Sequence, residues 1–472
     1  MPFSSKNSLT VFMYIFKNGI KLFFGLGILV LLGGCGFKDS APEVYKIDLE
    51  VWGVFDDSDA YQEIFSAYQE INPYVGQINY RKLQPENYEQ ELLQALAANK
   101  GPDIFMLRNA WVETFQDKIE PAPKTYTEKA YREAFVDVVA EDFMGEDRKI
   151  YGAPISVDSL ALYYNKDLFN AAGIARPPTT WEELSADSAL LTRLTATGAF
   201  EQSGVALGTA TNINRSTDIL TAMMFQLGVE PGIGSQVDIS SQKSAKALEF
   251  YTQFSNIASP RYTWNTSQHY SIDSFYEGTL GMMINYSWQY PTLKQKNAKL
   301  NIGIAPLPQF IGGTQSNVAN YWGYAVTRNK EYVSANPEKD TMTQDKYTAL
   351  RRHEAWQLLR YMTYPQVNKT FTLENGLTGT TKDFPVAFDP AVKYLEETQK
   401  PAARRDLIQQ QQSDVVLGPF ASGNLLAKQW KHTDVNRAET ILAETIESVV
   451  RGERTIQDAL NIASNRLRVL SQ

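Results

Sequence analysis

The chain has 472 residues, a formal net charge of −8 and an aromatic content of 12%, but a single cysteine and three histidines. One cysteine excludes an internal disulfide, a thiolate zinc cluster and a redox pair, and the three scattered histidines are too few for most metal sites, so we expect neither a metal nor a cofactor. A negative net charge without a long basic run disfavours a nucleic-acid partner. The length is sufficient for two sizeable cores.

The N-terminal segment has the pattern of an export signal. Lys17 and Lys21 precede an apolar run at 22–32, which as a helix spans about 16 Å and is too short for a hydrocarbon core of roughly 30 Å. Small residues then lead into Cys35, and this arrangement resembles the lipobox of bacterial lipoproteins, in which the cysteine is lipidated and becomes the mature N-terminus. The alternatives are an uncleaved anchor or an ordinary secretory signal with a chance cysteine.

Strands and helices alternate in the chain after this segment. The sequence predicts strands at 46–52, 75–83 and 101–107, a helix that buries Tyr61, Ile64, Phe65, Tyr68 and Ile71, and a helix over 87–99. This order predicts an α/β fold with a parallel sheet. Ligands bind such sheets beyond the carboxyl ends of the strands, so 53–59 and 108–111 are candidate binding loops.

Two helix starts carry the pattern of a capping box. We expect Thr180 to cap one helix with Glu183 returning a bond, and Thr455 and Asp458 to do the same for another. Trp181, in the first turn of the first helix, is expected to pack inside, as is Trp356.

Several fragments occur in the order found in one protein family. They are "GPDIFMLRNAWVETFQDKIEP", "KIYGAPISVDSLALYYNKDLFNAAGIARPPTTWEEL", "FYEGTLGMMINYSWQY", "IGIAPLP", "YWGYAVTRNK", "EAWQLLRYMTYPQVNKTFTLENGLTGTTKD" and "ETILAETIESVVRGERTIQDALNIASNRL". Together they span most of the chain after the signal. The sequence resembles the family-1 extracellular solute-binding proteins of ABC importers, the group that includes maltose-binding protein.

The resemblance implies an α/β, type II-like periplasmic-binding-protein fold of two lobes joined by hinge crossings, with a ligand cleft between the lobes. Crossings are expected near 152–154, 320–323 and 385–390. The expected division is a signal peptide at 1–35, a tether at 36–44, a first lobe at 45–151 plus 321–388, and a second lobe at 155–318 plus 389–470.

The expected ligand is a carbohydrate, because the candidate cleft residues combine rings for sugar faces with polar side chains for hydroxyls, and a buried unpaired hydroxyl costs about 1–3 kcal/mol. Trp288 matches the ring-stacking position of the family. The candidates are Trp52, Asp56, Asp57, Arg108, Asn109, Trp111, Asp158, Asn212, Asn214, Arg215, Trp288, Tyr290, Tyr321, Trp322 and Thr378.

Structural roles remain open for some of these candidates. Asp56 and Asp57 could be solvated carboxylates or helix caps, Arg108 could form only an ion pair, and Asn212 and Asn214 could be turn residues. The sequence also departs from the maltodextrin binders at 108–111 and 208–215, where it carries Asn and Arg in place of acidic and aromatic sets. This leaves the particular sugar undetermined and keeps an anionic ligand possible, although a neutral mono- or oligosaccharide is preferred.

The resemblance implies a monomer outside the cytoplasm, lipid-anchored to the membrane, with a small-molecule ligand and ABC permease subunits as partners, and no enzymatic activity. A surface protein that serves a sensor kinase or adhesion is an alternative. An exported glycan hydrolase with paired carboxylates is another, although no G-x-S-x-G, H-E-x-x-H or P-loop motif is present.

Overall fold

The computed structural model describes residues 45–230, 232, 237–332, 342–430 and 434–470. The predicted signal peptide at 1–35, with its lipidation site Cys35, and the tether at 36–44 lie outside the described residues. No helix within the described ranges is both long and apolar enough to cross a membrane.

The first sheet has five strands in the order β2-β1-β3-β11-β4. Strand β1 pairs in parallel with β2 and β3, as the alternation of strands and helices predicted, while β11 is antiparallel to β3 and β4. These strands are β1 (Ile47–Gly53), β2 (Val75–Lys82), β3 (Ile104–Arg108), β4 (Ile119–Glu120) and β11 (Trp322–Thr327).

Helices pack against this sheet through amphipathic faces. Tyr61, Ile64, Phe65 and Tyr68 of α1 are buried, as their helical spacing predicted. Trp356 of α12 is buried in the same core, which confirms its predicted role in packing. The helices of this core are α1 (Asp59–Ile71), α2 (Pro85–Ala97), α3 (Val112–Phe115), α4 (Glu128–Ala134), α5 (Asp137–Phe143), α12 (Gln344–Thr363), α13 (Pro390–Thr398) and α14 (Arg405–Gln411).

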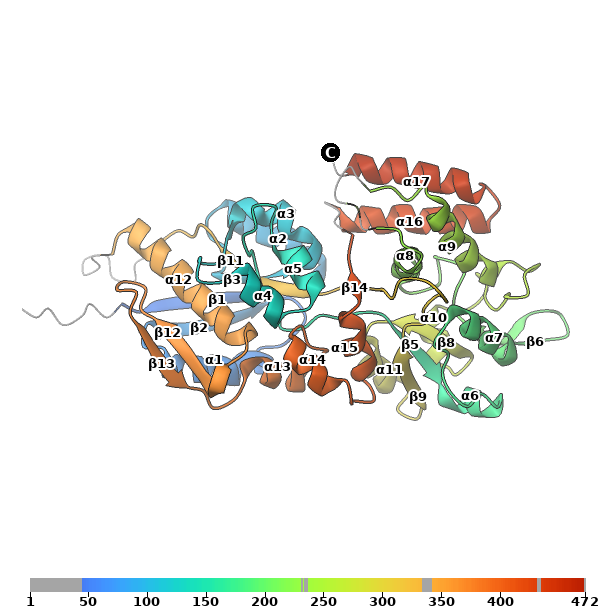
Figure 1. Ribbon diagram of the computed structural model, residues 1–472, viewed down its shortest axis with the longest axis horizontal. Helices are drawn as coiled ribbons and strands as arrows, with labels where there is room; N and C mark the ends of the chain where they lie inside the picture. The colour runs from blue at the N-terminus through green and yellow to red at the C-terminus, as the bar shows by residue number, and fades with distance from the viewer. Residues whose placement is uncertain (1–44, 231, 233–236, 333–341, 431–433, 471–472) are drawn as a thin grey trace, which may run out of the picture. The chain divides into compact units, whose positions relative to one another are not determined.

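The second sheet has the order β6-β7-β8-β5-β9. Its central strand β8 is buried at every position, since it is parallel to β7 and antiparallel to β5 and covered on both faces. Figure 1 shows the two sheets with their surrounding helices. The strands are β5 (Ala161–Asn165), β6 (Arg193–Leu194), β7 (Phe200–Val205), β8 (Leu280–Asn285) and β9 (Ile302–Pro306).

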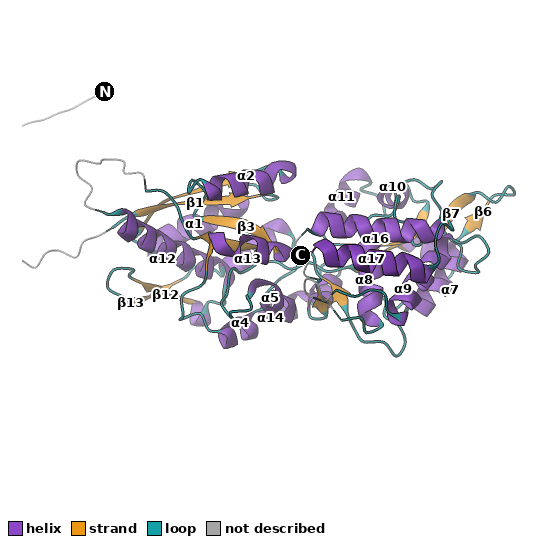
Figure 2. Cartoon of the chain, turned by 90° about the horizontal axis from the view of Figure 1, so that it is seen from above, coloured by secondary structure: helices purple, strands orange, loops and turns teal. Residues whose placement is uncertain are grey.

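A second set of helices surrounds this sheet and its separate core. The two C-terminal helices, α16 and α17, pack side by side in both ribbon views (Figures 1 and 2). The helices are α6 (Lys166–Ala171), α7 (Trp181–Leu191), α8 (Ser216–Gln226), α9 (Gln242–Thr252), α10 (Ser271–Tyr276), α11 (Gln289–Lys296), α16 (Val435–Val450) and α17 (Ile456–Leu470). We call each sheet with its helices the first and second lobe.

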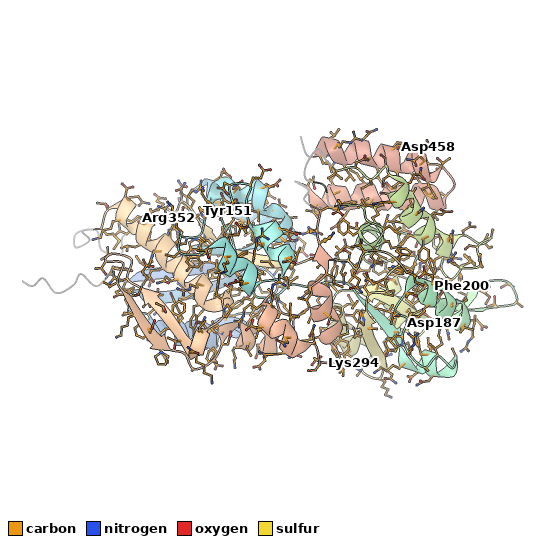
Figure 3. All side chains as sticks on the ribbon, in the orientation of Figure 1. Tyr151, Asp187, Phe200, Lys294, Arg352 and Asp458 are labelled. Atoms are coloured by element: carbon orange, nitrogen blue, oxygen red, sulfur yellow. The ribbon has the colours of Figure 1, made fainter. Side chains whose placement is uncertain are left out.

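The predicted helix caps are largely confirmed. The Thr180 side chain accepts from the Glu183 backbone N–H at 3.1 Å, but the Glu183 carboxylate accepts from the backbone N–H of Thr179, one residue earlier than a capping box requires. Thr455 accepts from the Asp458 backbone N–H at 3.2 Å, and Asp458 is labelled near the start of α17 in Figure 3. Trp181 is fully buried, as predicted.

Two segments pass between the two cores at 157–160 and 318–319, beside the expected crossings at 152–154 and 320–323. Val157 belongs to the first core and Leu160 to the second, while Val318 belongs to the second core and Ala319 to the first. Backbone bridges join the crossing segments, including Ala153 to Tyr324 and Ser159 to Ala319. The short strands β10 (Asn317–Val318) and β14 (Ala427–Lys428) pair in parallel beside them.

The third crossing differs from the prediction, which placed it at 385–390 and assigned 389–470 to the second lobe. Helix α13 buries Tyr394 and Leu395 against α1 and α12, and α14 also belongs to the first core. The chain returns to the second lobe only beyond α14, through α15 (Gly418–Asn424) and β14. The apolar face of α13 is the physical reason, and it places 389–408 with the first lobe. A hairpin of β12 (Thr370–Glu374) and β13 (Thr381–Pro385) completes that lobe.

Candidate functional site

A cavity of about 600 Å³ brings together residues from both lobes, and we call it the ligand pocket. Strand ends and crossing segments supply most of its lining, as expected for open α/β sheets. The lining residues are Phe55, Met106, Arg108, Ile155, Ser156, Asp158, Arg215, Ser287, Trp288, Thr292, Asn320, Tyr321, Trp322, Tyr324, Tyr394, Lys400, Pro401, Asn436 and Glu439.

The first lobe contributes an interlocked aromatic wall. Trp322 begins β11 and is half-buried, and its ring meets the rings of Phe55, Tyr88 and Trp111 edge-on at 5.4, 5.8 and 5.1 Å. Phe55 follows β1 and keeps 47% of its surface exposed. The edge-to-face contacts fix the orientation of the Trp322 ring, which leaves a preformed apolar surface in the pocket.

A buried polar network backs this wall. The Asp56 carboxylate accepts from Lys400 Nζ at 2.6 and 2.7 Å and from the Tyr394 hydroxyl at 2.6 Å. The hydroxyls of Tyr61 and Tyr324 lie 2.6 Å apart in the same cluster. Burial, together with the nearby Tyr324 and Asp56, raises the pKa of Tyr394 well above its usual value, so its hydroxyl stays protonated and able to donate.

The second lobe presents one tryptophan. Trp288 is the N-cap residue of α11, directly after the loop that follows β8, and is 39% exposed. Its ring stacks on Tyr286 at 4.5 Å with an interplanar angle of 21°. The guanidinium of Arg215 lies 5.5 Å from the Trp288 ring and 5.7 Å from the Tyr286 ring, at distances typical of cation–π contacts. Tyr286 and Arg215 therefore fix the position of the Trp288 ring, while 39% of the residue stays exposed to solvent.

Asp158 is the buried carboxyl group of the pocket. Ser287 donates to it from its backbone N–H at 2.9 Å and from its hydroxyl at 2.5 Å, and Ser159 donates from its backbone N–H at 2.8 Å. Burial raises the pKa of Asp158 to about 7, and these hydrogen bonds only partly oppose the rise. The group therefore titrates near neutral pH.

Charged groups of both signs line the pocket. Arg108 donates to Glu439 at 3.2 Å, which joins the first lobe to α16 of the second. Burial raises the pKa of Glu439, and nearby Asp218 raises it further, while Arg108 opposes the rise. Arg215 has a left-handed backbone conformation, and its buried Nε has no acceptor within the described part of the chain. This N–H is a donor that a bound molecule could satisfy.

Six of the fifteen predicted site residues line the ligand pocket, and Asp56 lies directly behind it. The first lobe provides Arg108, Tyr321 and Trp322, and the second provides Arg215 and Trp288, with Asp158 on the crossing between them. Whether these six contact a ligand stays a prediction.

Three predicted aromatic or charged residues of the first lobe lie outside the pocket. Trp52 is buried and donates to Glu50, and Asp57 forms an exposed ion pair with Lys82. Trp111 is buried behind Trp322, where it supports the pocket ring without lining the cavity.

The other predicted residues outside the pocket are engaged by local structure. The Asn212 side chain donates hydrogen bonds to the backbone carbonyls of residues 265 and 268. The Asn214 side chain forms hydrogen bonds with Tyr270 and Asn285. Both residues therefore stabilise the loops around them. Tyr290 packs on the second core. Thr378 is exposed in the turn between β12 and β13, and Asn109 lines a different cavity.

Sequence reasoning missed several lining residues. Phe55 could have been found, because it lies in the loop after β1 that the strand-end rule marked. Tyr394 and Lys400 were missed because 389–470 was assigned to the second lobe. Glu439 follows the start of α16, a helix in which no site residue was predicted.

The architecture is that of a two-lobed α/β binding protein with a ligand pocket at the crossings. The family model described as bacterial extracellular solute-binding protein matches residues 53–369. The chain therefore belongs to the bacterial extracellular solute-binding protein family, as its motifs predicted. This is a class of binding proteins that act outside the cytoplasm, and it is not an enzyme class.

Relatives agree with this membership. A protein of Brucella abortus (strain 2308) that is named as a binding protein is 25% identical over 377 residues, covering 79% of this chain and 83% of that protein. The maltotriose-binding protein of Pyrococcus abyssi is 24% identical over 343 residues, covering 71% of this chain and 65% of that protein. The structure of the sugar-binding protein MalE from Xanthomonas citri superposes with a TM-score of 0.67 at 17% identity, covering 90% of this chain and 97% of that one. This likeness confirms the predicted fold.

Proposed function

We propose that this chain is the substrate-binding lipoprotein of an ABC importer and that its ligand pocket captures a neutral mono- or oligosaccharide. The observation that carries the proposal is that one cavity is lined by a tryptophan from each lobe, Trp322 from the first and the 39% exposed Trp288 from the second. Sugar rings present C–H faces that pack on such rings, and their hydroxyls require the polar groups that lie between.

The charges in the pocket favour a neutral ligand over an anionic one. Arg108 is paired with Glu439, and Lys400 is paired with Asp56, so two of the three lining cations are already compensated. Arg215 lies against two aromatic rings, with an unused Nε donor that suits a hydroxyl acceptor. An anionic solute would have to displace Glu439 or Asp56 to gain full use of these cations.

The crossing segments support a role in transport. Three segments join the lobes, two of them through a few residues each, and such connections let two rigid bodies close over a ligand. Closure would create a surface that a permease can distinguish from the open form, and the ligand would shift the population by its differential affinity. The relative from Pyrococcus abyssi is named for maltotriose binding, which supports an oligosaccharide. We extend the proposal to lipid anchoring through Cys35, cleavage of 1–35, and action as a monomer.

The test is a calorimetric titration of the full-length chain with neutral sugars, polyols, amino acids and glycerol phosphates. One neutral sugar should bind with one-to-one stoichiometry, and at a hundred times its Kd it should raise the free energy of unfolding by about 2.7 kcal/mol. Binding should weaken at least about tenfold in Trp288→Ala.

A matched control is available in the same lobe. Tyr270 is 40% exposed, close to the 39% of Trp288, but does not line the pocket, so Tyr270→Ala should bind like the wild type. Cleavage of any sugar in the panel would overturn the proposal in favour of a hydrolase. Tight binding of an anionic solute alone would overturn the assignment of the ligand class.

A further inference from the structure

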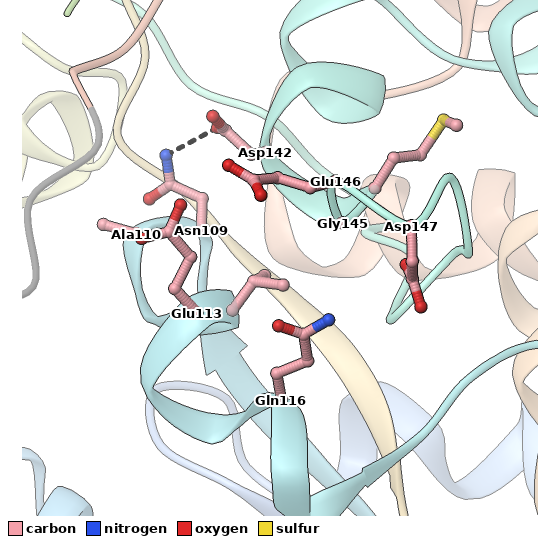
Figure 4. Close-up of a pocket in the computed structure, with 10 residues that line it drawn as sticks. Asn109, Ala110, Glu113, Gln116, Asp142, Gly145, Glu146 and Asp147 are labelled. Carbon is pink, nitrogen blue, oxygen red and sulfur yellow. Dashed lines mark hydrogen bonds between the residues drawn. The ribbon is translucent and has the colours of Figure 1, made fainter. Parts of the chain in front are cut away.

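The first lobe contains a second cavity, of about 670 Å³, which we call the acidic pocket (Figure 4). It lies between the residues that follow β3 and the loop after α5. Glu113, Asp142, Glu146 and Asp147 line it, and no lysine, arginine or histidine occurs among the described residues of its lining. Four carboxyl groups therefore line one cavity, and Lys149, which pairs with Asp147 at 2.9 Å, lies outside that lining.

Two of these carboxylates are fixed and two are free. Asp142 is 4% exposed, and its Oδ2 accepts from Asn109 Nδ2 and from the Tyr321 hydroxyl, each at 2.9 Å. Asp147 accepts from the Tyr151 hydroxyl, also at 2.9 Å. For the described residues, no hydrogen bond or ion pair reaches Glu113 or Glu146.

An independent observation comes from Asn109. This side chain is 2% exposed, and its Oδ1 has no donor within the described part of the chain. The amide is held in this orientation because Nδ2 donates to the Asp142 side chain at 2.9 Å. Figure 4 shows the Glu113 and Glu146 carboxylates pointing toward Asn109 and Asp142, while Asp147 points away. The two free carboxylates thus lie on the side of the cavity that Asn109 lines.

The spacing of these acceptors suits a nitrogen cation better than a metal ion. Metal ions need several ligands within about 2.0–2.6 Å of one point, and no group of three or more acidic, histidine or cysteine side chains among the described residues could hold one. A guanidinium carries five N–H donors in a planar fork and can reach acceptors on several sides. A primary ammonium group has three N–H donors and carries the same positive charge, so it would also suit these acceptors.

We propose that the acidic pocket is a second binding site, for a guanidinium or primary ammonium group, with Asn109 Oδ1, Glu113 and Glu146 as its acceptors. The cation would satisfy the buried Asn109 oxygen and neutralise the two free carboxylates. Charge-assisted hydrogen bonds of this kind are stronger than those between neutral groups. The site is separate from the ligand pocket, so it holds whether or not the ligand there is a carbohydrate.

The test is calorimetry of the sugar-free, full-length chain with agmatine at low ionic strength. The wild type should bind one agmatine saturably, with a Kd near or below about 1 mM, and salt should weaken binding because both free carboxylates are exposed. The double variant Glu113→Gln/Glu146→Gln should bind at least about tenfold more weakly with an unchanged melting temperature, because substitutions of exposed side chains rarely alter stability.

The control variant is Glu182→Gln/Glu201→Gln, which removes two exposed carboxylates of the second lobe and should bind like the wild type. A peptide with one arginine and blocked ends distinguishes the source of the cation. Tighter binding of the peptide indicates a side chain of a partner protein, and tighter binding of agmatine indicates a free amine. Absence of saturable binding, equal binding by the double variant, or displacement of agmatine by equimolar Mg²⁺ would overturn the proposal.

Discussion

The two walls of the ligand pocket are built differently. The wall of the first lobe is continuous with its core: Trp322 contacts three other rings, and Tyr324 belongs to the Asp56–Lys400 network. The wall of the second lobe consists of Trp288 at the start of a helix, supported by Tyr286 and Arg215, with Asp158 buried beside it. Substitutions in the first wall should therefore affect folding and binding together, whereas loss of Trp288 should affect mainly binding.

The largest expected effect belongs to Asp158, the buried acid of the second wall. Its pKa is raised to about 7 in the folded chain, against about 3.9 when unfolded, so between these values the folded state binds the extra proton. The free energy of unfolding should consequently fall as pH rises from about 4 to 7, by up to about 4 kcal/mol, and then level off.

Urea unfolding of the wild type and of Asp158→Asn at pH 5 and pH 8 measures this effect. The variant lacks the titrating group, so the difference between the two proteins should change with pH in the stated direction. If the difference in unfolding free energy between the two proteins is the same at pH 5 and pH 8, Asp158 is ionised at both.

Removal of Trp322 should give the next largest effect. Trp322→Ala removes a ring that packs on three others, and truncation of core aromatic residues costs about 3–5 kcal/mol. Because Trp322 is only half-buried, we expect about 3 kcal/mol, measured by chemical unfolding, together with loss of ligand binding. A cost below about 1 kcal/mol would show that the first wall is no more integrated than the second.

Neutralising Asp56 should cost about 2 kcal/mol, since hydrogen bonds to charged groups contribute about 1.5–3 kcal/mol and Lys400 would lose its partner. The neighbouring Asp57 is a matched control, because its side chain is 75% exposed and its ion pair with Lys82 lies at the surface. Asp57→Asn should change the free energy of unfolding by less than about 0.5 kcal/mol. Equal losses of unfolding free energy in the two variants would show that the Asp56 network does not stabilise the fold.

Apart from the control variants, the smallest effect on stability is expected for Trp288→Ala. Loss of its stacking on Tyr286 should cost about 1 kcal/mol, which is within the range for aromatic pairs. Its effect on ligand affinity should be far larger than its effect on the free energy of unfolding. Thermal unfolding with and without ligand separates the two, and a melting temperature as low as that of Trp322→Ala would abolish the distinction between the walls.

Local pattern predicted much of the fold. The alternation at 46–52 and the spacing of Tyr61, Ile64, Phe65 and Tyr68 correspond to β1 and α1, because burial of one face leaves a periodic trace in the sequence. The third crossing left no such trace. The apolar face of α13 fits either lobe equally well in sequence, and only its packing on α1 and α12 decides.

The site was less predictable than the fold. Trp288 and Trp322 follow a strand or begin one, so the topology placed them at the pocket. Asn212 and Asn214 carry suitable groups at plausible positions, but their hydrogen bonds go to neighbouring loops. The choice between a ligand and a local partner depends on side-chain direction, which residue spacing does not specify.

The central claim is that rings from both walls hold one neutral sugar. Calorimetric titration of the wild type, Trp288→Ala and Tyr270→Ala with the neutral sugar that binds best tests it most directly. The account predicts one-to-one binding with a negative heat-capacity change, as expected when apolar surface is buried, and at least about tenfold weaker binding for Trp288→Ala alone. Equal affinity of all three proteins, or no neutral sugar bound while an anionic solute binds, would contradict it.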